Sequence, residues 1–217
     1  VLLGCNTATA VALRRLQQTW LPASHWAATH NVIGIVAPTV EAATQTPWAV
    51  TSPQYPQKNN TDLIAVFGTM RTVTSGVFPE EISKRCPKVT VIQQMCSELA
   101  GAIETKRPET ELDALVADGV RGVMAQTANM PPHRAILGCT HFPLVEHLFR
   151  RHLPPFTRIL SQPEVVADSF EDYLQRRPHY VTDNAGGQLT LLTTGDPADV
   201  SAKARVFWPD VAAFQKV

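Results

Sequence analysis

Two cysteines in this sequence share the same local context, and the chemistry that they could perform depends on there being two of them. Cys5 follows the apolar segment VLLG, Cys139 follows the similar segment AILG, and a helix-like pattern comes after each. A helix N-terminus offers free backbone N–H groups and partial positive charge, which lower a cysteine pKa and can hold a carboxylate. Paired sites of this kind suit inversion at a stereocentre, since one base removes a proton from one face while an acid delivers a proton to the other.

The repetition, and not either cysteine by itself, favours a chemical role. A single cysteine after an apolar strand is most often a small buried hydrophobe. The residues Asn6, Thr7 and Thr140, which come directly after the two cysteines, carry amide and hydroxyl groups that can donate hydrogen bonds to a carboxylate. Cys86 and Cys96 lack the preceding strand and glycine, so we interpret them as structural.

Apolar runs alternate with helical periodicity along most of the chain, which predicts an α/β fold with mainly parallel sheets flanked by helices. The carboxyl ends of such strands are where ligands bind in open α/β sheets, and both cysteines stand at such ends. The expected strands include residues 1–4, 32–36, 63–67, 89–92, 135–138 and 158–160. The expected helices include residues 8–20, 93–103, 111–127, 142–152 and 163–175.

Composition narrows the class of partner. The 217 residues contain 19 basic and 19 acidic side chains, so no basic surface for nucleic acid is expected. No apolar run is long enough to span a bilayer, and the four cysteines show no metal-ligand spacing. We therefore expect a cytoplasmic enzyme that acts on a small molecule and uses no metal or other cofactor.

Three segments resemble the signature motifs of glutamate racemases, in the aspartate/glutamate racemase superfamily. They are GCNTA around Cys5, LGCTHFPL around Cys139, and the threonine-rich GTMRTVTSG that begins at Gly68. The resemblance implies two pseudo-symmetric lobes with the active site in the cleft between them. Residues 1–38 and 161–217 would form the first lobe, with its N-terminal part missing, and residues 39–160 the second.

The resemblance also implies a role for each motif residue. Cys5 would act on the α-proton of D-glutamate, Cys139 would act on that of L-glutamate, and His141 would assist Cys139 as a proton partner. The substrate's carboxylates and amine would be held by Asn6, Thr7, Thr69, Thr72 and Thr140. The product D-glutamate would supply peptidoglycan synthesis, and a homodimer is expected because dimers are frequent in this family.

The sequence departs from the family pattern in two places. The family's Asp-Ser-Gly and Pro-Tyr-Gly segments precede the first cysteine and do not occur here, so we expect the polypeptide to lack an N-terminal portion that holds an acidic partner for Cys5. The family also has an acidic residue after the middle strand, and Glu98 is the nearest candidate.

Three other interpretations remain open. A related racemase acting on aspartate or hydantoins is the first, although His141 favours glutamate because the aspartate enzymes tend to carry Glu at that position. A truncated or non-catalytic racemase-like binding protein is the second. Cys–His hydrolysis is the weakest, since it gives no reason for a second matched cysteine.

Overall fold

The computed structural model describes residues 1–50, 52–57, 62–181 and 188–217. These residues form two compact units, Val1–Asp172 and Tyr173–Val217. All the candidate site residues named above belong to the first unit. The expected lobes, residues 1–38 with 161–217 and residues 39–160, stay a prediction.

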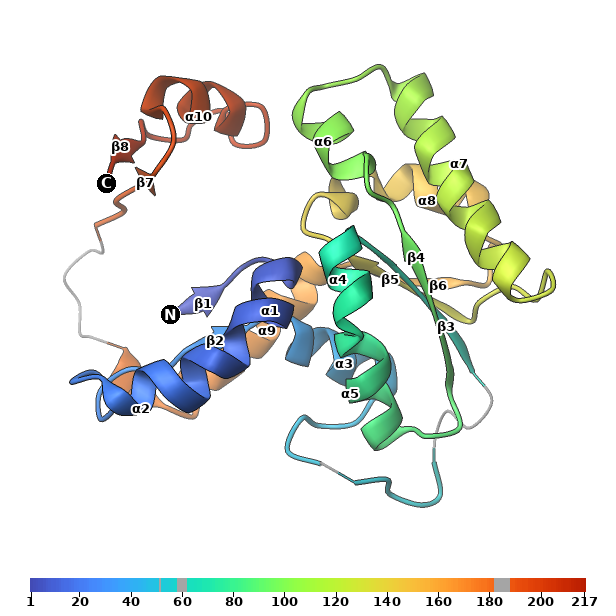
Figure 1. The fold of residues 1–217 in the computed structure, drawn as a ribbon, viewed down its shortest axis with the longest axis horizontal. Coiled ribbons are helices and arrows are strands. Elements are labelled where there is room, and N and C mark those ends of the chain that lie inside the picture. Colours follow the sequence, from blue (N-terminus) through green and yellow to red (C-terminus); the bar gives the residue numbers. More distant parts are fainter. Residues whose placement is uncertain (51, 58–61, 182–187) are drawn as a thin grey trace. The chain divides into compact units, whose positions relative to one another are not determined.

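A four-stranded parallel sheet in the order β4–β3–β5–β6 forms the centre of the first unit (Figure 1). Its strands are β3 (Leu63–Gly68), β4 (Thr90–Met95), β5 (Arg134–Gly138) and β6 (Arg158–Leu160). The two inner strands, β3 and β5, are apolar almost throughout because helices cover both faces of the sheet. The expected α/β architecture with parallel strands is thereby confirmed.

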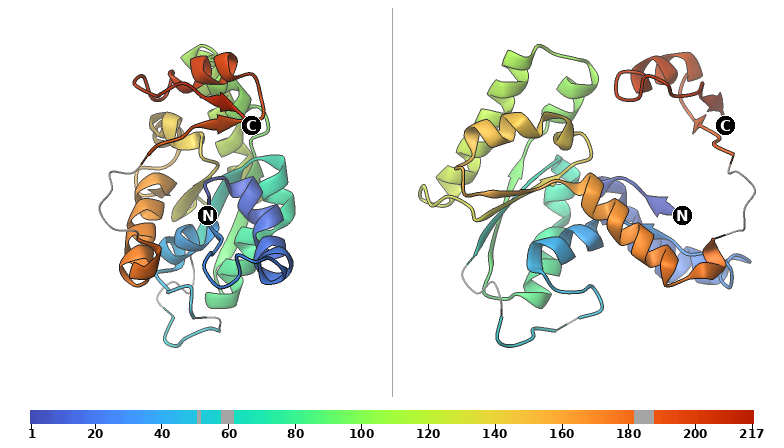
Figure 2. Two further views of the ribbon diagram at one scale, coloured as in Figure 1. Left: turned by 90° about the vertical axis from the view of Figure 1, so that its left-hand side faces the viewer. Right: turned by 180° about the vertical axis from the view of Figure 1, so that it is seen from behind.

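Alternate residues of β3 point to opposite faces of the sheet, and each face has its own apolar core. Ala65 and Phe67 pack into one core, whereas Ile64 and Val66 pack into the other. Residues of α6 (Leu99–Glu104), α7 (Glu109–Gln126) and α8 (Glu146–His152) complete the first core. Residues of α3 (Val36–Thr44) and α5 (Val77–Arg85) complete the second. Figure 2 shows these helices on either side of the sheet.

A second, smaller sheet carries the first cysteine. It consists of β1 (Leu2–Leu3) and β2 (Ile33–Gly34), which pair in parallel. Helix α1 (Asn6–Arg15) follows β1 and continues through a π-helical turn (Leu16–Trp20) into α2 (Leu21–Ala23). This helical stretch includes residues 8–20, where a helix was expected. A Cβ at Gly34 would lie 2.4 Å from Thr9 Cγ2, so α1 packs on β2 at a distance that only glycine permits.

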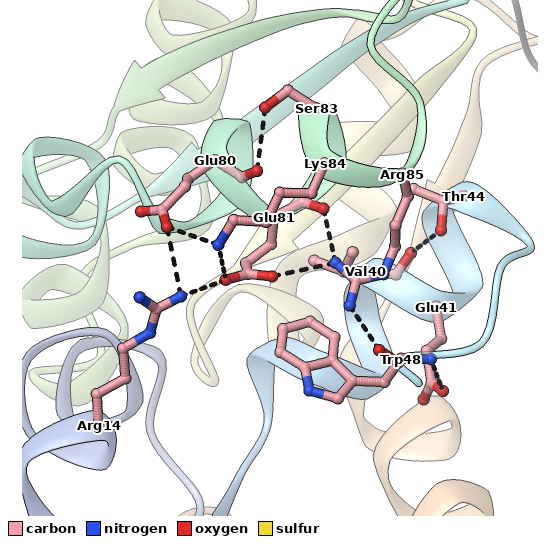
Figure 3. A network of polar contacts seen from close by, with 10 residues as sticks. All are labelled: Arg14, Val40, Glu41, Thr44, Trp48, Glu80, Glu81, Ser83, Lys84 and Arg85. Atoms are coloured by element: carbon pink, nitrogen blue, oxygen red, sulfur yellow. Dashed lines mark hydrogen bonds and ion pairs between the residues drawn. The ribbon is translucent and has the colours of Figure 1, made fainter. Parts of the chain in front are cut away.

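Helix α1 is also tied to α5 by an ion-pair network (Figure 3). Arg14 Nη2 lies 2.5 Å from Glu81 Oε1, and Lys84 Nζ lies 2.9 Å from the same oxygen. The buried Arg85 donates from Nη1 to Glu81 Oε2 at 3.0 Å and from Nη2 to the Trp48 carbonyl at 2.8 Å. Its guanidinium lies 4.1 Å from the centre of the Trp48 ring. Glu81 therefore stays ionised inside the protein, because several cationic side chains form ion pairs with its carboxylate.

The second unit is the smaller of the two. Asp196 caps α10 (Pro197–Ala204) by accepting a hydrogen bond from the Asp199 backbone N–H at 2.8 Å. The short strands β7 (Leu192–Thr193) and β8 (Gln215–Lys216) pair in parallel beside it.

The remaining helices are α4 (Met70–Ser75) and α9 (Gln162–Gln175), with 3₁₀ turns at Phe142–Val145 and Pro178–Tyr180.

None of the helices in the described ranges combines the length and the apolar character that crossing a membrane requires.

Candidate active site

Cys5 occupies the position where β1 turns into α1. Its backbone is extended, with φ −143° and ψ 129°, and it is the residue that precedes the first helical turn. The Cys5 carbonyl accepts the first intrahelical hydrogen bond from Thr9 N–H at 2.9 Å, and the residue is exposed. The first backbone N–H groups of a helix have no partner within the helix, so an anion bound beside Cys5 could accept hydrogen bonds from them.

Cys139 occupies the corresponding position after β5, but the element that follows it differs from the expectation. Residues 142–152 were expected to form one helix, whereas Phe142–Val145 is a 3₁₀ turn and α8 begins only at Glu146. Pro143 lies in the first turn, where its missing N–H costs nothing. Cys139 is buried, and its carbonyl accepts a hydrogen bond from Phe142 N–H at 3.1 Å.

The strand register brings the Cys139 segment beside the threonine-rich segment. Gly68, the last residue of β3, pairs with Gly138, the last residue of β5. Neighbouring strands lie about 4.8 Å apart, so Thr69 and Cys139 leave the sheet at adjacent points. A Cβ at Gly138 would lie 3.0 Å from the Phe67 carbonyl oxygen, which explains the glycine before this cysteine.

Three threonine hydroxyls from two segments meet at this edge of the sheet. Thr7 Oγ1 on α1 lies 3.0 Å from Thr69 Oγ1 and 3.2 Å from Thr72 Oγ1, and the last two oxygens are 3.2 Å apart. Thr69 also caps α4 by accepting from Thr72 N–H. The contact joins the segment after Cys5 to the segment beside Cys139, so both cysteine motifs adjoin the same group of hydroxyls. Hydroxyls can both donate and accept, and a cluster of three can rearrange its hydrogens to face a carboxylate.

A histidine and a glutamate form a chain of polar contacts with Cys139. His141 Nδ1 lies 3.7 Å from Cys139 Sγ, and His141 Nε2 lies 2.7 Å from Glu104 Oε1. The expected contact of His141 with Cys139 is therefore present. An imidazole with a carboxylate on one nitrogen and a thiol on the other can relay a proton between the thiol and solvent.

The surroundings of Cys139 favour its neutral thiol. Burial has the largest effect and raises the pKa of Cys139 above its ordinary value of 9.0, and negative charge on Cys5 or Glu104 raises this pKa further. The backbone N–H groups of His141 and Phe142 act in the opposite direction by stabilising the thiolate. At neutral pH Cys139 consequently holds its proton and is poised to act first as an acid.

Asn6 takes part in a buried amide network that the sequence did not suggest. Its Nδ2 donates to Gln162 Oε1 at 2.5 Å, and its Oδ1 accepts from Gln162 Nε2 at 3.0 Å. Gln162 Nε2 also donates to Thr39 Oγ1 at 2.7 Å. Thr140, by contrast, is exposed next to Cys139.

Two residues of this site, Glu104 and Gln162, were not predicted from the sequence. The acidic partner of His141 is Glu104, at the end of α6, whereas Glu98 pairs with Arg107 at 3.6 Å. Gln162 directly precedes the helix expected at residues 163–175, and in the structure it is the first residue of α9. Position along α6 gives a weak signal for Glu104, because an acidic residue at the end of a helix opposes the helix dipole and so needs another reason to be there.

The remaining cysteines are buried, as expected of structural residues. Burial raises the pKa of Cys96 to about 12, and the charge of Cys139 adds to this increase. Burial also raises the pKa of Cys86. Both thiols are therefore protonated at neutral pH.

Comparison with known proteins supports a single family. No family model matches the chain. A glutamate racemase from Phenylobacterium zucineum is 42% identical over 218 residues, which cover 99% of this chain and 76% of that protein. Among solved structures, glutamate racemase isoform RacE1 from Bacillus anthracis is 25% identical, with a TM-score of 0.79 over 100% of this chain and 72% of that one.

A second solved structure extends the likeness of fold. Glutamate racemase from Francisella tularensis, in complex with D-glutamate, has a TM-score of 0.76 and covers 99% of this chain and 70% of its own, at 16% identity. At that identity the match concerns the fold alone.

Proposed function

The chain belongs to the glutamate racemase family and its activity is the racemisation of glutamate; we propose that Cys5 and Cys139 carry it out as opposed acid and base. The observation that carries this proposal is the meeting of Thr7 with Thr69 and Thr72 at the strand end where Cys139 begins. That contact brings the segment that follows Cys5 to the strand end where Cys139 begins. We infer that a substrate held by these hydroxyls would have one thiol on each side.

The reaction proceeds through removal and return of the α-proton. In the direction from D- to L-glutamate, the Cys5 thiolate takes the α-proton, and the Cys139 thiol gives its own proton to the opposite face of the carbanion. In the direction from L to D the roles exchange, with the Cys139 thiolate as the base. After each turnover one thiol has gained the proton that the other has lost, so protons must return through solvent.

The relay of Cys139, His141 and Glu104 serves this return. Because burial keeps Cys139 protonated, its thiolate form needs a neighbour that accepts the proton. His141 Nδ1 is placed to accept it, and Glu104 stabilises the positive charge that then develops on the imidazole. His141 is in this way the general-base partner of the buried thiol.

The polar side chains around the thiols position the substrate. We assign the carboxylates and the amine of glutamate to Asn6, Thr7, Thr69, Thr72 and Thr140. Hydrogen bonds to the α-carboxylate matter for rate as well as affinity, because they stabilise the charge that spreads onto it as the carbanion forms.

The wider setting follows from the substrate. The proposed product, D-glutamate, would serve peptidoglycan synthesis in the cytoplasm. A homodimer is the proposed assembly, and sedimentation velocity of the full chain would measure it directly.

Circular dichroism of D- and L-glutamate tests the assignment. Cys5→Ser and Cys139→Ser are each expected to abolish racemisation in both directions, because each direction needs both groups. Cys86→Ser is the matched control and should leave turnover unchanged. Full racemisation by either of the first two variants would refute the two-cysteine mechanism, and a panel with aspartate and hydantoins would detect a related substrate preference.

A further inference from the structure

Gln162 is far from Asn6 in the sequence but is joined to it by two hydrogen bonds in the interior. The residues are 156 positions apart, and the two side-chain amides exchange hydrogen bonds of 2.5 and 3.0 Å. Asn6, Gln162 and their neighbour Thr39 are 2%, 3% and 1% exposed. A buried side-chain amide must satisfy its donors and acceptors inside the protein, so this arrangement constrains which atom of each amide points where.

The direction of the network is set by a backbone carbonyl. Thr39 donates its hydroxyl hydrogen to the Ile35 carbonyl at 2.8 Å, and a carbonyl can only accept. Thr39 Oγ1 is therefore left as an acceptor toward Gln162, which must present its Nε2 at 2.7 Å. Gln162 Oε1 then faces Asn6, and Asn6 in turn must present its Nδ2 to that oxygen.

The consequence at the site is a fixed orientation of the Asn6 amide. Both hydrogens of Gln162 Nε2 are used, one on Asn6 Oδ1 and one on Thr39 Oγ1. Asn6 Nδ2 uses one hydrogen on Gln162 and keeps a second N–H. Asn6 lies between Cys5 and Thr7 in the sequence, so whatever holds its side chain also holds the turn that presents the Cys5 thiol and the Thr7 hydroxyl.

We propose that Gln162 is a positioning residue for the Cys5 half of the reaction, acting through the buried Asn6 amide. This inference rests on the proposed function, in which Cys5 exchanges a proton with the D-enantiomer. Gln162 itself does not touch the reacting atoms. It keeps an N–H of Asn6, and not the carbonyl oxygen, available to a substrate carboxylate, and it anchors the Cys5 turn to α3 and α9.

Two variants of Gln162 separate polarity from shape. Gln162→Glu keeps the size of the side chain but replaces the donor with an acceptor, so Asn6 Oδ1 and Thr39 Oγ1 lose their hydrogen bonds. Gln162→Met keeps the length and removes all polar atoms. Thr39→Val removes the hydroxyl that orients Gln162 and should have the same effect in weaker form. Thr44→Val is the matched control, because Thr44 lies on the same helix, is also buried, and also bonds the carbonyl four residues earlier.

The first readout is the primary deuterium isotope effect on kcat/KM with glutamate deuterated at the α-carbon. Displacement of reacting groups by about 1 Å can cost on the order of 100-fold in rate, and we expect kcat/KM of both Gln162 variants to fall by about 10- to 100-fold. The equilibrium constant of a racemisation is one, so this fall must be equal for the two enantiomers. The isotope effect need not be equal: when the Cys5 step slows, it rises with α-deuterated D-glutamate and falls with α-deuterated L-glutamate.

A purely structural role for Gln162 would give a different pattern. Loss of folded protein lowers the apparent kcat and leaves KM and both isotope effects unchanged, which is the result expected of Thr44→Val if it affects activity at all. Unchanged isotope effects in Gln162→Glu and Gln162→Met, with whatever loss of rate, would overturn the proposal.

The second readout is the affinity for D-glutamate. Calorimetry with D-glutamate should give a Kd raised about 10-fold or more by Gln162→Glu, since the oriented N–H of Asn6 is lost and a carboxylate is added nearby. An unchanged Kd would also count against the proposal. The Cys5→Ser variant distinguishes failure of the two hypotheses. Racemisation that survives in Cys5→Ser refutes the proposed function. If Cys5→Ser loses racemisation but the isotope effects of the Gln162 variants are unaltered, the positioning role alone is refuted.

Discussion

Replacing Glu104 with glutamine is the most informative single change on the Cys139 side of the site. The variant keeps the length of the side chain and an oxygen that can still accept from His141, and it removes only the charge. Glu104 Oε1 lies 2.7 Å from His141 Nε2, and the two side chains are 52% and 29% exposed. Water therefore reaches both members of the pair and screens their attraction.

This exposure limits the size of the expected effect. Ion pairs that are open to solvent contribute about 0.2–1 kcal/mol. Since a tenfold change in rate corresponds to about 1.4 kcal/mol of activation free energy, Glu104→Gln should lower turnover by at most about fivefold. The loss should come from the Cys139 step, so the primary isotope effect should rise with α-deuterated L-glutamate and not with the D-enantiomer.

Glu98→Gln provides the matched control. Glu98 immediately precedes the same helix, is exposed, and pairs with Arg107 at 3.6 Å, away from His141. Its turnover and isotope effects should equal those of the wild type. An unchanged rate in Glu104→Gln would refute the relay, and a loss of more than about 100-fold would mean that Glu104 acts on the substrate directly, since screening allows no such effect through His141.

Two further predictions concern pH and stability. Burial raises the pKa of Cys139, and turnover of L-glutamate requires the Cys139 thiolate, so kcat with L-glutamate should rise as the pH increases toward and beyond 9.0. Over the same pH range kcat with D-glutamate should fall, because that direction requires the Cys139 thiol. A pH profile that is identical for the two enantiomers would contradict this assignment. Arg85→Met should lower the free energy of unfolding by about 3 kcal/mol in urea titrations, because it removes the buried partner of Glu81 and the hydrogen bond to the Trp48 carbonyl. Arg14→Met removes an exposed partner of the same carboxylate and should lower the free energy of unfolding by less than about 1 kcal/mol.

The fold and the two cysteine motifs could be predicted because their signals are local. An apolar run followed by glycine and cysteine marks a strand end wherever it occurs, and Cys5 and Cys139 both lie where this pattern indicated. The prediction of strand β4 was less accurate. Residues 89–92 were expected, but the strand is Thr90–Met95, since pairing with β3 continues through the polar Gln93 and Gln94 on an edge strand that remains partly exposed.

The side-chain network of the site could not be predicted, because it depends on contacts between distant segments. The helical pattern after Cys139 could not distinguish the 3₁₀ turn Phe142–Val145 from the first turn of an α-helix. Glu104 meets His141 only when α6 packs beside the β5 end of the sheet. Gln162 meets Asn6 only once α9 returns to the start of α1, and nothing in the sequence around either amide indicates that contact.

Isotope exchange in deuterated water tests the two-thiol mechanism most directly. L-glutamate is incubated with the full chain until a small fraction has been converted, and mass spectrometry measures deuterium at the α-carbon of the D-product and of the recovered L-substrate. If one thiol removes the proton and a second thiol on the opposite face supplies another, the product carries solvent deuterium while the recovered substrate retains protium. Deuterium appearing equally in both enantiomers, or protium retained in the product, would mean that a single base serves both faces, and Cys5 and Cys139 would then not be an opposed pair.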